Sequence, residues 1–120
     1  MDTLILEGIL RRLAADLTGR SLLRVARGGT LEYHLRFATP AADRLVIRLR
    51  PPHPCLHRAA HREAARAVPP DPFAALLERT LEGARLERIH RPGLDRVVEM
   101  DWETLAGERR TLVAELIEPP

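Results

Sequence analysis

The sequence predicts an α+β fold in which antiparallel β-sheets, arranged like a sandwich, are covered by two main helices. Two segments carry apolar residues at three- and four-residue spacing between typical helix start and stop signals. The other regular segments alternate apolar and polar residues and are joined by short turns, which is typical of antiparallel strands with one solvated face. The chain has 120 residues, and we expect one domain over residues 1–120.

The first helix is expected over residues 2–17. Asp2 is a suitable N-cap, and Gly19 ends the helix because glycine readily adopts the left-handed conformation required there. One apolar stripe follows the helix axis, and it consists of Leu6, Ile9, Leu10, Leu13 and Leu17.

Three strands are expected next, over residues 22–27, 31–37 and 44–50. Apolar residues in the second and third strands alternate with mostly polar ones, so the polar side chains are expected on a solvent-exposed face. The residues assigned to this outer face are Glu32, His34, Arg36, Arg44, Val46, Arg48 and Arg50.

Proline residues end the third strand, since proline has no amide hydrogen to donate to a neighbouring strand; they are Pro51, Pro52 and Pro54. A short extended piece is expected at residues 55–57. Residues 59–68 are either one or two helical turns or a loop.

The second helix begins at Asp71, which serves as N-cap, with Pro72 in the first helical position, and it ends at Gly83. A meander of three strands joined by short turns follows this helix. Its strands are expected over residues 84–90, 95–102 and 109–118.

The composition fits a soluble, cytoplasmic domain. Aromatic residues make up only 3% of the chain and hydrophobic residues 45%, so the core must consist mainly of aliphatic side chains. Cys55 is the only cysteine, which excludes an internal disulfide and suits a reducing compartment. There is no secretion signal and no apolar run near the roughly 20 residues that cross a bilayer.

All 19 basic residues are arginine, yet the formal net charge is only +2. One explanation is genomic, because a GC-rich coding bias favours arginine over lysine. Asparagine and glutamine are absent as well, which fits a hot environment where these amides degrade. The other explanation is phosphate binding, because the planar guanidinium matches phosphate oxygens. The two explanations are compatible, and so small a net charge does not by itself predict nucleic-acid binding.

One segment has residue types that ligate zinc, but its spacing lacks the paired ligands of structural sites and Pro54 interrupts it. The residues are His53, Cys55, His57 and His61. A polar loop explains them more simply, and we expect neither a metal nor another cofactor. Ser21 is the only serine, it lies in no nucleophile motif, and no glycine-rich phosphate loop is present, so no enzymatic activity is expected.

The pair Asp95-Arg96 follows a Pro92-Gly93 turn and opens an apolar segment. Taken alone, the pair is explained by surface ion pairs that flank a hairpin and contribute little. Neighbouring strand residues point to opposite faces, so the two side chains act at one site only if the chain bends or bulges beside the turn.

The order of these elements resembles the N-terminal domain of the NFACT family, the ribosome-quality-control factors also called RqcH or fibronectin-binding protein A. The resemblance covers nearly the whole chain, beginning with Asp2 before an amphipathic helix. It is sharpest from Pro72-Phe73 through Leu81-Glu82-Gly83 to Gly93-Leu94-Asp95-Arg96, and it ends with residues 112–116. It implies a fold similar to the N-terminal domain of formamidopyrimidine-DNA glycosylases.

The resemblance also implies a function. Intact family members bind tRNA and large ribosomal subunits that carry a stalled peptidyl-tRNA, and in bacteria they support the addition of an alanine tail. The residues implied for tRNA engagement are Asp2, Asp95 and Arg96. Further phosphate contacts are expected from Arg24, Arg36, Arg48 and Arg50. The family's other name makes fibronectin an alternative partner.

The sequence departs from the family in three respects. Glu78 stands where the family has a basic residue before the end of the second helix. The later parts of the family, including its coiled coil, are absent, so we expect a domain excised from a longer protein or a very short relative. The start Met1-Asp2 lacks the terminal proline that glycosylase chemistry requires, which makes a DNA glycosylase the least favoured alternative.

Overall fold

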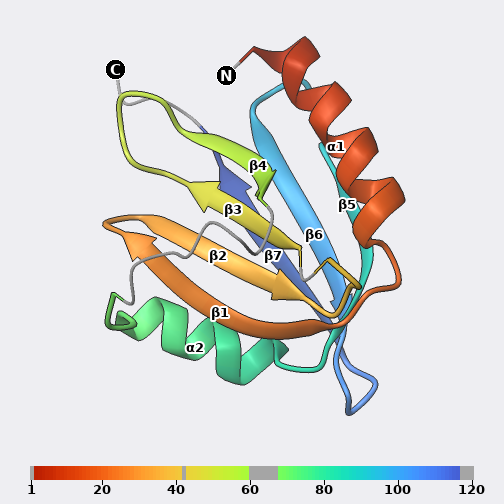
Figure 1. The fold of residues 1–120 in the computed structure, drawn as a ribbon. Helices are drawn as coiled ribbons and strands as arrows, with labels where there is room; N and C mark the ends of the chain where they lie inside the picture. Colours follow the sequence, from red (N-terminus) through yellow and green to blue (C-terminus); the bar gives the residue numbers. More distant parts are fainter. Residues whose placement is uncertain (1, 42, 60–67, 117–120) are drawn as a thin grey trace.

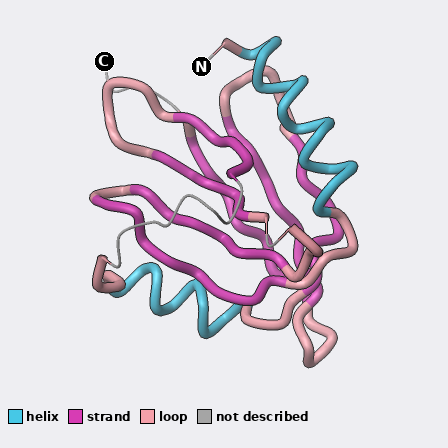
Figure 2. The backbone as a smooth tube through the Cα atoms, in the orientation of Figure 1, coloured by secondary structure: helices cyan, strands magenta, loops and turns pink. Residues whose placement is uncertain are grey.

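Two antiparallel sheets face each other, and a helix lies along each side of the pair (Figure 1). The computed structural model describes residues 2–41, 43–59 and 68–116. Figure 2 shows the strands at the centre and the helices at the periphery. In chain order the elements are α1 (Thr3–Leu17), β1 (Leu22–Gly29), β2 (Glu32–Phe37), β3 (Arg44–Arg48), β4 (Cys55–Ala59), α2 (Pro72–Leu81), β5 (Arg85–His90), β6 (Val97–Glu103) and β7 (Arg109–Glu115).

This architecture confirms the predicted α+β class, with a four-stranded sheet ordered β1-β2-β3-β4 and a three-stranded sheet ordered β5-β6-β7. Every strand pair within the two sheets is antiparallel. The core is mainly aliphatic, with leucine as its commonest residue, as the low aromatic content requires. Its one stacked aromatic pair among the described residues joins the sheets, because Phe37 of β2 lies 5.7 Å from Trp102 of β6, centroid to centroid, at an interplanar angle of 16°.

Both helices begin at the predicted caps. The Asp2 carboxylate accepts a hydrogen bond from the Leu4 amide, and the Asp71 carboxylate accepts one from the Ala74 amide, each at 2.7 Å. Helix α1 lies against β4 and β5, while α2 lies against β1. Asp71 also accepts a hydrogen bond from the Tyr33 hydroxyl at 2.9 Å, which fixes the start of α2 to the four-stranded sheet.

Backbone hydrogen bonds join the two sheets at one corner, where the chain leaving α1 meets the chain leaving α2. The Gly19 amide donates to the Leu86 carbonyl at 2.7 Å, and the Leu22 amide donates to the Ala84 carbonyl at 2.8 Å. Gly83 has a φ of 80°, which glycine adopts without steric strain. The halves of the chain are therefore connected by main-chain bonds as well as by the core.

The outer face of β2 and β3 differs from the prediction. His34, Arg44 and Val46 are buried there, whereas the alternation pattern assigned them to a solvent-exposed face. The Glu32 carboxylate binds Arg48 Nε at 2.7 Å and His34 Nε2 at 3.1 Å, and Arg44 approaches the other His34 ring nitrogen at 3.4 Å. Long side chains that bind one another in this way shield each other from solvent, and a polar-apolar pattern alone does not reveal this.

Several strand boundaries also differ. Strand β3 ends at Arg48, so Arg50 lies in an exposed loop, and the predicted extended piece at residues 55–57 is part of β4. Most of the segment for which helical turns or a loop were expected, residues 60–67, lies outside the described residues, as do residues 117–120. No helix in the described ranges combines the length and apolarity needed to cross a membrane.

Replacement of a core leucine should cost far more stability than replacement of an exposed one. Leu86 is 0% exposed and Leu4 is 82% exposed. We expect Leu86→Ala to lower the free energy of unfolding by about 2–5 kcal/mol, because it removes buried apolar surface and leaves a cavity. Leu4→Ala should change it by less than about 0.5 kcal/mol. Urea unfolding followed by circular dichroism measures both, and equal losses would contradict this core.

Glu32 should make stability depend on pH. Burial alone would raise the pKa of its carboxyl group, but hydrogen bonds from Arg48 and His34 outweigh burial and lower the pKa below the usual 4.5. Its stabilising contribution is therefore complete above pH 4.5 and is lost as the pH falls through the lowered value. We expect Glu32→Gln to destabilise the protein at pH 7 by about 1–3 kcal/mol. The difference from the unmodified chain should shrink in acid; a difference that is constant from pH 7 to pH 3 would contradict the ion pairs.

Candidate functional site

The loop between β5 and β6, residues 91–96, is held against α1 by one arginine. The Arg91 side chain is only 12% exposed, and its Nε donates to Glu7 Oε1 at 2.7 Å. Its terminal nitrogen donates to the Leu94 carbonyl at 2.6 Å and lies 3.4 Å from the Asp95 carbonyl. A single guanidinium therefore binds both the loop backbone and the helix, and it fixes the position of the loop.

Asp95 and Arg96 lie in the bend that precedes β6. The prediction that the strand begins at Asp95 is wrong, because the first paired residue of β6 is Val97. The Asp95 side chain is exposed and that of Arg96 is half-buried, while the Arg96 carbonyl accepts a hydrogen bond from the Leu116 amide at 2.8 Å. Within the described residues neither side chain forms an ion pair or a hydrogen bond. Both residues are anchored through the main chain.

Asp2 lies at the same end of the molecule as this loop, because α1 begins beside the β5–β6 connection (Figure 1). One oxygen of its exposed carboxylate caps the helix by accepting from the Leu4 amide. The structure thus brings Asp2 to the end that holds Asp95 and Arg96. Glu7 and Arg91 make the contact between α1 and the loop, and no pattern in the sequence indicated this pairing.

The four arginines expected to contact phosphate fall into two places on the four-stranded sheet. Arg24 and Arg36 are direct cross-strand partners on β1 and β2. Arg48 pairs instead with Glu32, at the opposite end of β2, about 13 Å away at the usual rise per residue. Arg50 lies exposed beyond β3. The pair Arg24–Arg36 has no carboxylate partner among the described residues, so two like charges lie side by side without neutralisation.

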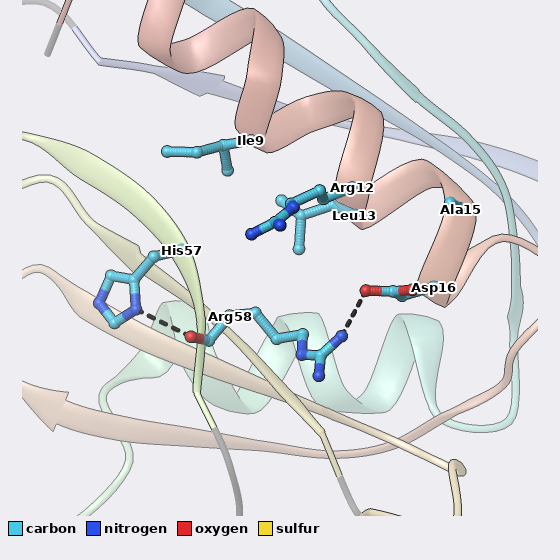
Figure 3. Close-up of a pocket in the computed structure, with 7 residues that line it drawn as sticks. All are labelled: Ile9, Arg12, Leu13, Ala15, Asp16, His57 and Arg58. Atoms are coloured by element: carbon cyan, nitrogen blue, oxygen red, sulfur yellow. Dashed lines mark hydrogen bonds and ion pairs between the residues drawn. The ribbon is translucent and has the colours of Figure 1, made fainter.

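A pocket of about 650 Å³ lies between α1 and β4 (Figure 3). Its lining residues are Ile9, Arg12, Leu13, Ala15, Asp16, His57 and Arg58. Arg58 is neutralised by Asp16 and by Asp43, the latter at 3.3 Å. Arg12 extends from α1 over the pocket and has no ion-pair partner in the described part of the chain. Paired charges therefore dominate this pocket, and a strong preference for anions does not follow.

The zinc-ligand types noted in the sequence do not converge where the structure describes them. His57 Nδ1 faces the Arg58 carbonyl at 3.3 Å, and within the described residues no group of three potential metal ligands includes His53, Cys55 or His57. His61 lies outside the described residues. The side chains that do converge are His90, Glu99 and Asp101, which sequence reasoning missed because they meet only through the pairing of β5 with β6.

Glu78 has a structural role that accounts for its departure from the expected basic residue. Its carboxylate accepts a hydrogen bond from the Val25 amide of β1 at 3.4 Å. The negative charge therefore joins α2 to β1.

The fold and the anchored Asp95-Arg96 loop define a two-sheet α+β domain with an exposed charged loop at one end. The chain belongs to the NFACT family, since the model of the NFACT N-terminal and middle domains matches residues 2–118. None of the curated protein sequences matches the chain significantly.

Solved structures share this fold. The N-terminal part of the fibronectin/fibrinogen-binding protein of Streptococcus suis is 19% identical with a TM-score of 0.83, over 94% of this chain and 44% of the other. The N-terminal domain of the fibronectin-binding protein PavA from Streptococcus pneumoniae is 21% identical with a TM-score of 0.86, over 98% and 48%. The fibrinogen-binding protein of Staphylococcus aureus is 20% identical with a TM-score of 0.79, over 98% of this chain and 42% of the other. The chain thus spans less than half the length of each.

Loss of the Arg91 guanidinium should release the loop. We expect Arg91→Met, which keeps an apolar stem, to destabilise the protein by about 1–3 kcal/mol, because the Leu94 carbonyl and Glu7 lose a charged donor. Amide hydrogen exchange at residues 93–96 should accelerate more than in the core. Arg88→Met, which changes an exposed arginine of β5, the strand that leads into the loop, is the control and should leave these rates unchanged. Equal protection of the loop in both variants would refute the tether.

Proposed function

We propose that the chain is a non-catalytic tRNA-binding module of a ribosome-quality-control factor that acts in the cytoplasm. The observation that carries the proposal is the loop of residues 91–96, on which Asp95 and Arg96 are anchored by their backbones and have no side-chain partners among the described residues. A charged pair that a fold holds in place without using it internally is suited to a ligand.

The chemistry of these groups fits an RNA. A guanidinium donates two parallel hydrogen bonds to a phosphate, and a carboxylate accepts hydrogen bonds from exocyclic amines and 2′-hydroxyl groups. Arg96 would bind the backbone, while Asp95 would favour particular donors and reject a misplaced phosphate by charge repulsion. Asp2, at the same end of the molecule, keeps one carboxylate oxygen that the helix cap does not use.

Arg24 and Arg36, which lie next to each other on β1 and β2, support a second contact with the RNA backbone. They are cross-strand partners with no carboxylate to neutralise them in the described residues, and a phosphate between them would relieve their mutual repulsion. Arg48 is already paired with Glu32 and contributes less to this proposal than Arg24 does. Arg50 is exposed and adds positive charge beyond β3.

The other activities of intact family members would need further parts of a longer protein. Binding to the large ribosomal subunit and support of alanine tailing require parts beyond a chain that spans 42–48% of its structural neighbours. The alternative is a protein-interaction role, since these neighbours are named for binding fibronectin or fibrinogen. An exposed charged loop can bind an acidic protein as well, so the two functions need a direct comparison.

We expect the purified chain to bind deacylated tRNA, and Arg96→Ala to weaken the binding by about 1–3 kcal/mol, roughly five- to 150-fold in Kd. The matched control is Arg109→Ala, which removes the same charge from the opposite end of the three-stranded sheet, where the side chain is 84% exposed. Fluorescence anisotropy over a range of salt concentrations measures both variants, and affinity should fall as salt rises.

Two outcomes would overturn the assignment. Equal losses of tRNA affinity in Arg96→Ala and Arg109→Ala would mean that the binding of tRNA depends only on the net charge of the protein. Salt-resistant binding to fibronectin that depends on Arg96, with no measurable binding to tRNA, would favour the protein-interaction alternative. A strand-nicking assay on oxidised DNA should show no cleavage, as expected of a non-catalytic domain.

A further inference from the structure

Three side chains that can ligate a metal converge on the outer face of the three-stranded sheet. His90 is the last residue of β5, and its direct cross-strand partner on β6 is Glu99. Asp101 lies two residues along β6 and therefore on the same face. His90 Nε2 is 3.7 Å from Glu99 Oε1 and 3.7 Å from Asp101 Oδ2. The three ligand atoms all lie within 4.8 Å of one another.

These separations are close to those of a metal's coordination shell. Zinc binds imidazole nitrogen and carboxylate oxygen at about 2.1 Å, so two ligands in a tetrahedral site lie about 3.4 Å apart. The His90 nitrogen is therefore within a few tenths of an ångström of that spacing from both oxygens. The Thr111 hydroxyl of β7 donates to the other Asp101 oxygen at 2.9 Å, which turns Oδ2 toward His90 as supporting hydrogen bonds do in metal sites.

The charge around the cluster is also unusual for this protein. The chain has 19 arginines, yet within the described residues no arginine forms an ion pair with Glu99 or Asp101. Arg88 is opposite Asp101 in the strand register but does not bind it, and the neighbour of Glu99 on β7 is the apolar Val113. Among the described residues, His90 is thus the only side chain that can form an ion pair with these two carboxylates, and a divalent cation would neutralise both.

We propose that His90, Glu99 and Asp101 bind one divalent transition-metal ion of the zinc type. All three side chains are partly exposed, so the remaining coordination positions face solvent and hold water. The histidine disfavours magnesium and calcium, which prefer sites made of oxygen ligands alone. Because His90 and Glu99 join the two strands directly beside the loop of residues 91–96, the bound ion would also clamp the base of that loop.

Titration of the tag-free, chelator-stripped chain with zinc chloride, followed by isothermal calorimetry, tests the proposal without reference to tRNA. We expect one ion per chain, a higher midpoint of thermal unfolding with zinc, and no comparable effect of magnesium. His90→Ala should weaken zinc binding by about tenfold or more, because it removes the nitrogen ligand. His57→Ala removes a histidine from β4 and should leave the affinity unchanged.

Asp101→Asn provides a second variant that retains the shape of the side chain, in case His90→Ala does not fold. It should also weaken zinc binding by about tenfold or more. Absence of stoichiometric zinc binding would overturn the proposal and leave the contacts of His90 with the two carboxylates as the account of this cluster. Zinc binding that survives both substitutions, or that is lost in His57→Ala, would place the ion elsewhere and overturn it as well.

Discussion

The ion pair between Arg91 and Glu7 is the interaction on which the arrangement of the charged end depends. It joins the loop of residues 91–96 to a helix that begins more than eighty residues earlier in the chain. Arg91 also binds the Leu94 carbonyl, so the guanidinium sets both the position of the loop and its internal shape. Without this bond, the turn that carries Asp95 and Arg96 would be restrained by the pairing of β5 with β6 and by the main-chain hydrogen bond between Leu116 and Arg96.

The rest of the fold supplies a rigid frame for this end of the molecule. The stacked pair Phe37–Trp102 spans the two sheets, and backbone bonds between Gly19 and Leu86 close their corner. Each helix lies against a sheet edge, with α1 against β4 and β5 and α2 against β1. The tightly packed core fixes the position of α1 relative to β5. The Arg91–Glu7 bond depends on this fixed position, because Glu7 lies on α1 and Arg91 directly follows β5.

Local signals in the sequence predicted the helices well, because capping and periodicity act over a few residues. Asp2 and Asp71 cap the helices that they were expected to cap. The prediction of an exposed face on β2 and β3 was wrong for His34 and Arg44, because their burial depends on contacts between their side chains across the two strands and between His34 and Glu32. Arg91 could not be distinguished from the other arginines, because its partner Glu7 is distant in sequence. The His90 cluster likewise required the register of β5 against β6, including the irregularity near Leu86.

The most direct test of the central claim is nuclear magnetic resonance of the labelled chain as tRNA is added. If the loop tethered by Arg91 is the tRNA-binding element, the largest shifts of amide signals will occur in residues 2–7 and 91–97 and will diminish as salt is raised. Shifts confined to α2 and β7, or spread evenly over the arginine-bearing surface, would contradict the account.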